Sequence, residues 1–265
     1  MIAKALESLK KNPVVVVFYV LYLMVVFAIT YVFFANNLGA NPDPAAAFSV
    51  LGKILLGALI MGVIGIVFFA GYGKMAADAV TLGETSTAAF GEGVKKFFVR
   101  VLLAALLLFA FYLGFSIVIG IIMIPFSIMF AMNDPANAVA AGAMIGLVTS
   151  GIMMLIIVFV APFIMLWFPA IFVDDIGVME GLKRGAKAAV KGYWFLVLST
   201  FIMYLPSVLY MVFNYSSMMN AQTMTKANMF TPAYLAMCLI SAVLGIVFMQ
   251  LLIVVYNEKK SLIQA

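Results

Sequence analysis

The charged residues of this chain leave six long stretches without any charge. Each stretch has at least 20 residues, which is about the length that a helix needs to cross roughly 30 Å of hydrocarbon. In lipid, backbone N–H and C=O groups must be hydrogen-bonded within the protein, so a spanning stretch forms a helix or joins a closed barrel. The uncharged stretches are residues 12–42, 54–73, 101–133, 135–173, 192–225 and 227–257.

These stretches predict helices, because segments such as 14–17 and 102–111 are continuously apolar and lack the alternation of a barrel strand. The chain is 67% apolar and 9% charged. Soluble domains are about 45–50% apolar and about 25% charged. This composition excludes a soluble enzyme, a nucleic-acid-binding domain and a disordered tail. We therefore expect an all-α polytopic membrane helix bundle that forms one domain over residues 1–265. Its six transmembrane helices are predicted near residues 14–35, 51–73, 99–124, 142–166, 193–213 and 233–256.

The basic residues predict the orientation of the bundle. All but two of the 15 lysine and arginine residues lie in or beside the segments expected on one side of the membrane. The two exceptions are Lys53 and Lys226. Because loops rich in lysine and arginine stay in the cytoplasm, we expect a multi-pass protein of the plasma membrane with both termini cytoplasmic. The basic segments are residues 1–13, 74–98, 174–192 and 257–265.

A short basic segment precedes two apolar stretches three times along the chain. In each segment apolar residues recur at helical spacing, as Ile2, Leu6 and Leu9 do in the first. This pattern predicts three short cytoplasmic amphipathic helices that lie in the headgroup plane, at residues 2–12, 87–98 and 177–191. It also suggests an internal threefold repeat over residues 1–73, 87–172 and 177–256. The alternative is that any short inner connection tends to be basic and amphipathic. Candidate contacts to anionic lipid headgroups are Lys10, Lys11, Lys95, Lys96, Lys183, Arg184, Lys187 and Lys191.

Three carboxylates at membrane edges form a weak candidate polar site. Asp174 and Asp175 follow the fourth stretch, and Asp78 holds the matching place after the second. Oxygen ligands of this kind suit a hard cation such as Mg²⁺. We favour a simpler interpretation, in which Asp175 caps the following helix and Asp174 adds negative charge at its positive end.

Small residues within the stretches predict close helix packing. Gly71 and Gly73 precede a lysine, but they lack the strand–loop–helix context of a phosphate-binding loop, so we expect them to permit close helix packing or to end the helix. Small residues also recur near Gly62, in residues 142–150 and near Gly245. They suggest that the second, fourth and sixth helices meet at the centre or that one of them dimerises.

The sequence offers little material for catalysis. Histidine is absent, which removes the commonest general base and metal ligand, and the single Cys238 cannot form an intrachain disulfide. No charge lies inside the apolar stretches, which argues against ion-coupled transport. We expect no enzymatic activity, no cofactor and no metal, and favour a protein that binds lipids or a partner as a scaffold. The alternatives are a transporter or lipid-translocating protein and, less favoured, a metal-dependent membrane enzyme. Expected partners are anionic lipid headgroups, a second copy or another membrane protein, but no nucleic acid.

Two segments carry a family resemblance. The first is residues 5–13, ALESLKKNP, before an apolar stretch, and the second combines residues 173–175, 181–185 and 191–192 before a membrane helix. A weaker third segment covers residues 71–86. The chain resembles uncharacterised six-helix integral membrane proteins of archaea and bacteria. It is also similar to the membrane domain of some glycerophosphodiester phosphodiesterases, without their catalytic domain. The resemblance implies the six-helix fold and supplies no catalytic residues.

Overall fold

The structure, a computed structural model, describes residues 1–33, 44–133, 151, 155–156, 158–213 and 231–264. All the regular elements in these residues are helices, so the expected all-α class is confirmed. The elements are α1 (Ile2–Lys11), α2 (Pro13–Phe33), α3 (Pro44–Thr81), α4 (Thr87–Asn133), α6 (Trp167–Asp174), α7 (Val178–Lys191), α8 (Tyr193–Phe213), α11 (Pro232–Lys259) and α12 (Ser261–Gln264).

Local sequence signals set several helix boundaries. Pro13 begins α2 directly after α1, where a missing N–H costs nothing because the first turn has no partner for it. At the start of α11, the Thr231 side chain accepts a hydrogen bond of 3.2 Å from the backbone N–H of Tyr234, as capping residues do. Between α3 and α4, Gly83 has a φ of 85°, a conformation that glycine adopts without steric cost. These signals keep adjacent long helices separate.

Among the described residues, five helices are long and apolar enough to cross a membrane, and a sixth candidate is bent. The bent candidate joins Val158–Asp174 to Val178–Lys191 at an angle of 118°. The fourth expected helix, residues 142–166, lies in large part outside the described residues, and its described portion continues beyond residue 166 to Asp174. The five continuous spans are Pro13–Phe33, Phe48–Thr81, Thr87–Pro125, Tyr193–Tyr210 and Pro232–Lys259.

The structure corrects the expectation of three separate interfacial helices. α1 and α7 are separate helices, but residues 87–98 are the first part of α4, which continues to Asn133. Residues 101–108 contain only valine, leucine and alanine, mostly strong helix formers, and no glycine or proline breaks the helix there. At about 1.5 Å per residue, α4 is roughly 70 Å long and exceeds the hydrocarbon thickness about twofold.

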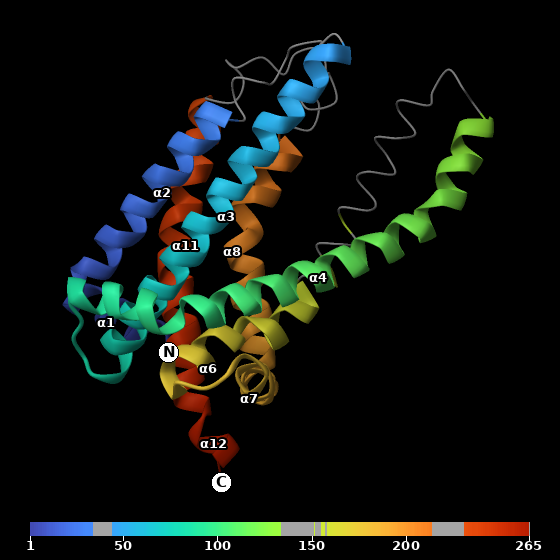
Figure 1. Cartoon of the computed structure of the whole chain (residues 1–265). Coiled ribbons are helices and arrows are strands. Elements are labelled where there is room, and N and C mark those ends of the chain that lie inside the picture. The colour runs from blue at the N-terminus through green and yellow to red at the C-terminus, as the bar shows by residue number, and fades with distance from the viewer. Residues whose placement is uncertain (34–43, 134–150, 152–154, 157, 214–230, 265) are drawn as a thin grey trace.

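The two termini lie at the same end of the bundle, together with α1, α7 and the end of α11 (Figure 1). From this end α2, α3, α8 and α11 run side by side, while α4 leans away from them (Figure 1). α11 is the central helix, because 50% of its most apolar segment is buried, against 6% of the most apolar segment of α2. The helix packing is therefore concentrated around α11.

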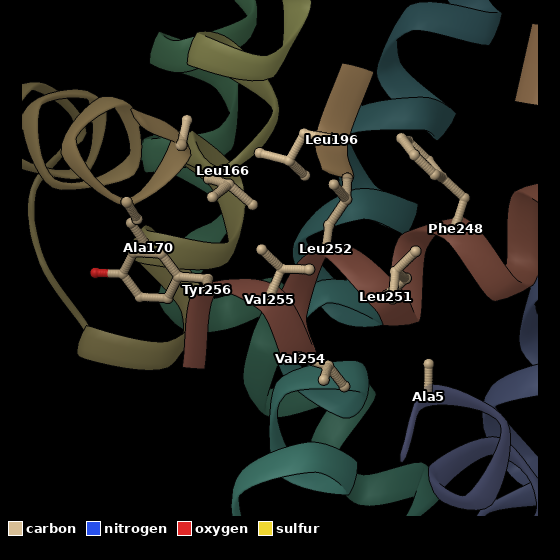
Figure 2. Packing of buried hydrophobic residues seen from close by; sticks show 12 residues of the cluster. Ala5, Leu166, Ala170, Leu196, Phe248, Leu251, Leu252, Val254, Val255 and Tyr256 are labelled. Carbon is tan, nitrogen blue, oxygen red and sulfur yellow. The ribbon is translucent and has the colours of Figure 1, made fainter. Parts of the chain in front are cut away.

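The buried part of α11 meets helices from distant parts of the chain. Leu252, Val255 and Tyr256 of α11 pack with Leu166 and Leu196 in one apolar cluster (Figure 2). Many large apolar side chains elsewhere on the long helices are exposed. These helices are long and apolar enough to cross a membrane, where such side chains would face lipid. Lipid is as apolar as these side chains, so close fit rather than exclusion from water holds the helices together.

Glycines provide that close fit at several places where an aromatic side chain of one helix packs against another helix. A Cβ atom on Gly71 would lie 2.5 Å from the Phe90 ring, and one on Gly73 would overlap the Phe172 ring. The expectation that these two glycines serve helix packing is therefore confirmed. Gly245 likewise accommodates Tyr19 of α2, whose hydroxyl would lie 2.5 Å from an added Cβ atom.

The expected meeting of small-residue faces is supported only in part. α11 contacts both α3 and α6, in agreement with a central meeting of these helices. A Cβ on Gly62 would meet nothing within 4 Å, so this glycine faces no neighbour among the residues with a described position. Residues 142–150 lie outside those residues.

Candidate functional site

Ion pairs connect several helices at the end of the bundle that holds both termini, which we call the polar end (Figure 1). Lys4 of α1 binds Glu258 of α11 with an Nζ–Oε1 distance of 2.7 Å. The two residues are 254 positions apart, so this pair joins α1 near the start of the chain to the end of α11. Further pairs at the polar end involve Asp174 and Asp175.

Asp174, the last residue of α6, is the most buried carboxylate of this network. Its side chain is only 9% exposed. It accepts hydrogen bonds from the Tyr256 hydroxyl at 2.6 Å, from Arg184 at 3.3 Å and from Lys260 at 3.5 Å. A carboxylate at low exposure needs such partners, because loss of water otherwise disfavours its charge. In Figure 2 the Tyr256 oxygen points away from the apolar cluster that surrounds its ring. Asp174 thus joins α6, α7 and the end of α11.

Asp175 joins the same region to α4. Its carboxylate accepts from Lys96 Nζ and from Arg100 Nη1, both at 2.7 Å. The hydrogen bond from Lys96, followed by that from Arg100, holds the pKa of this carboxyl below its usual range, because both donors favour the charged form. Asp175 has a φ of 55° and ends α6. Our expectation that it caps the next helix is wrong, because α7 begins after Gly177 without a side-chain cap. Its carboxylate is instead held by the two cations of α4.

Asp78, the third carboxylate of the candidate polar site, is neutralised within its own helix. Lys74, one turn earlier in α3, binds its two oxygens at 2.5 and 2.6 Å, as residues four apart on a helix can. The three carboxylates therefore pair with different cations. Among the residues whose positions are given, no group of three or more histidine, cysteine, aspartate or glutamate side chains could hold a metal ion.

The eight basic residues expected to contact lipid fall into two groups. All except Arg184 are exposed. Lys11 pairs with Glu7, Lys96 pairs with Asp175, and Arg184 binds both Asp174 and Glu180. Within the described part of the chain, the other five form no ion pair. This second group, which we call the free lysines, consists of Lys10, Lys95, Lys183, Lys187 and Lys191.

Polar side chains fix α1 against the core of the polar end. Gln250 of α11 is fully buried and donates to the Ser8 hydroxyl at 2.8 Å, and Ser8 donates to the Ala79 carbonyl at 3.1 Å. The Asn12 side chain accepts from the backbone N–H of Thr85 at 2.9 Å. These bonds hold α1 to α11 and to the turn between α3 and α4.

A cavity of ≈ 600 Å³ opens at the corner between α7 and α8. Lys191, Lys259, Tyr193, Trp194 and Phe163 are among its lining residues. Sequence reasoning singled out only Lys191 here. Aromatic residues close after a lysine, at the start of an apolar stretch, are typical of a membrane–water interface and could have indicated this corner. A second cavity, of ≈ 340 Å³, lies between α1, the end of α3 and the end of α11.

The fold and the polar end define the class of this protein. Several long apolar helices with exposed apolar surfaces, joined at one polar end, make it a helical membrane protein. The chain belongs to the family described as Domain of unknown function (DUF7847), whose model matches residues 1–259. No curated protein and no solved structure matches the sequence.

Proposed function

We propose that this protein acts without catalysis, by binding anionic lipid headgroups at the cytoplasmic face of the plasma membrane. The observation that carries the proposal is that the free lysines are exposed at the polar end and form no ion pair with the described residues, whereas other basic residues there are paired. Most carboxylates described at the polar end are paired with cations of the protein itself, so these exposed ammonium groups are left for an external anion. A lysine near an anionic surface contributes about 1 kcal/mol of binding.

The proposed orientation places the polar end in the cytoplasm. Both termini lie at this end, and most basic residues of the sequence belong to its segments (Figure 1). An excess of lysine and arginine favours the cytoplasmic side during membrane insertion. The negatively charged inner leaflet would then lie beside the free lysines.

The proposal includes the three basic segments as lipid-facing elements. α1 and α7 would lie along the membrane surface, and the start of α4 would enter it. Ile2 and Leu6 of α1 are 51% and 49% exposed, which leaves apolar surface for contact with lipid. We also propose that the chain contains the threefold repeat. We further propose that it is similar to the membrane domain, and not to the catalytic domain, of some glycerophosphodiester phosphodiesterases.

Lipid binding to the full-length protein in nanodiscs tests the proposal. The Lys95→Gln/Lys187→Gln variant removes two free lysines, and the Lys53→Gln/Lys226→Gln variant removes the two lysines expected on the opposite side. At about 1 kcal/mol each, the first pair should weaken enrichment of phosphatidylglycerol over phosphatidylcholine by up to about thirtyfold. The control variant should retain wild-type enrichment.

Equal phosphatidylglycerol enrichment in the two variants would refute the proposal. The same preparations can report lipid movement between leaflets. Faster transbilayer movement of labelled phosphatidylglycerol, unaffected by the Lys95→Gln/Lys187→Gln substitutions, would instead support the lipid-translocating alternative.

A further inference from the structure

The cavity at the α7–α8 corner has a defined place relative to the apolar spans. α7 ends at Lys191, the chain turns at Gly192, and α8 begins at Tyr193. The membrane-compatible span Tyr193–Tyr210 starts at this same residue. The cavity therefore lies where the polar end meets the apolar part of α8, which corresponds to the headgroup level of a bilayer.

Two uncompensated positive charges line this cavity. Lys191 comes from the end of α7 and Lys259 from the end of α11, and neither forms an ion pair with the described residues. The neighbouring Glu258 is already bound by Lys4. An ideal Cβ on Gly192 would lie 3.8 Å from the Lys259 Cε atom, so the lysine stem passes close to the corner. Two like charges on one cavity favour an anionic occupant, which relieves their mutual repulsion.

The remaining wall of the cavity is aromatic. The Tyr193 ring is near two other rings, with centroid distances of 5.3 Å to Phe163 and 5.4 Å to Trp194. Its hydroxyl donates to the Phe159 carbonyl at 3.0 Å, which fixes the ring at the corner. Trp194 is 73% exposed. Amphipathic rings at this level contact the glycerol and upper acyl region of lipids, which a soluble anion does not possess.

We propose that this cavity is a specific site for one anionic phospholipid, with Lys191 and Lys259 at the phosphate and the aromatic wall against the glycerol and upper acyl chains. The inference rests on the proposed function and narrows it. The other free lysines attract anionic lipid diffusely, whereas this corner holds a single molecule.

Native mass spectrometry of the full-length protein, titrated with phosphatidylglycerol in detergent, tests the site. The Lys191→Gln/Lys259→Gln variant removes both cavity charges, and Lys95→Gln/Lys187→Gln removes two exposed charges outside the cavity. The wild type and the second variant should each retain one tightly held phosphatidylglycerol. The cavity variant should bind its first lipid at least tenfold more weakly. Trp194→Ala should also weaken this first lipid while leaving both lysines in place.

Three outcomes would overturn the inference. One is equal first-lipid affinity in the cavity variant and the wild type. Another is the same loss in both double variants, since it would show diffuse attraction alone and leave the proposed function intact. The third is displacement of the lipid by glycerol 3-phosphate at equal concentration, which would show that the cavity takes a soluble phosphate. If neither double variant changes any phosphatidylglycerol binding, the proposed function fails as well. The substituted lysines are not buried, so we expect both double variants to fold. Size-exclusion chromatography checks that each variant elutes as the wild type does.

Discussion

Gly185→Ala should destabilise the crossing of α6 and α7. An ideal Cβ at this position lies 2.7 Å from the Leu166 carbonyl carbon and oxygen and 2.8 Å from the Trp167 nitrogen. All three atoms belong to the backbone, so no side-chain rotation relieves the overlap, and the two helices must separate. Overpacking of this kind costs about 1–3 kcal/mol, while alanine in place of glycine returns up to about 1 kcal/mol of helix propensity. Because the overlap is with backbone atoms, the upper part of the overpacking range, about 2–3 kcal/mol, applies, and after a propensity gain of about 1 kcal/mol the net loss is about 1–2 kcal/mol.

The loss is measurable as a shift in apparent Tm of the detergent-solubilised protein, followed by size-exclusion chromatography after heating. For a chain of this size, about 1 kcal/mol corresponds to roughly 2–4 °C, so the expected decrease is about 2–8 °C. Gly91→Ala is the matched control, because a Cβ on this exposed residue of α4 meets nothing within 4 Å. Its Tm should stay at or rise above the wild-type value. An apparent Tm of the Gly185→Ala protein equal to that of the Gly91→Ala control would refute the close-packing argument.

Three further predictions concern the polar end. Asp174→Ala should lower the apparent Tm by several degrees, because it leaves two cations and a tyrosine hydroxyl without their shared acceptor; an unchanged melting curve would contradict this role. The pKa of Asp175 is lowered in the folded state, so its stabilising contribution is present above the ordinary aspartate pKa and is lost as the pH falls through the lowered value. Asp175→Asn should therefore reduce the Tm at pH 7, and its difference from the wild type should shrink in acid; a difference independent of pH would refute the ion-pair explanation. Ser8→Ala removes the nearer of two acceptors of the buried Gln250 amide, and leaves only the Ala76 carbonyl at 3.4 Å. It should cost about 1–3 kcal/mol, and adding Gln250→Leu should recover part of that loss in a double-mutant cycle. Strictly additive effects would show that the two side chains do not interact.

The sequence was sufficient to predict those parts of the fold that depend on local composition. Where the structure describes them, the uncharged stretches of membrane length lie in helices, and Pro13 and Pro232 begin two of these helices. The same local reasoning failed at residues 87–98, where nothing in the sequence stops the helix and α4 continues through the expected boundary. It also assigned the wrong role to Asp175, because its partners Lys96 and Arg100 are distant in sequence.

The candidate site depended much more on tertiary structure. The sequence identified eight basic residues as candidate lipid contacts but could not separate paired from unpaired ones. Lys259 and the aromatic wall were not singled out, because the α7–α8 corner becomes a cavity only when the end of α11 lies beside it. The glycine contacts of α7 with α6 likewise require the 118° bend between these helices.

The sequence by itself determined that this protein is helical, that its helices suit a membrane and that its basic residues gather in the segments between the long apolar stretches. Helix formation in lipid follows from apolar length and backbone hydrogen bonding, which are properties of each segment alone. Only the tertiary structure decided which charges of different helices neutralise one another. Asp174 and Tyr256 are 82 residues apart, and their contact depends on how the helices pack. Charge pairing falls off with distance in space, not along the chain, so the lysines left without a partner emerge only once the bundle is assembled.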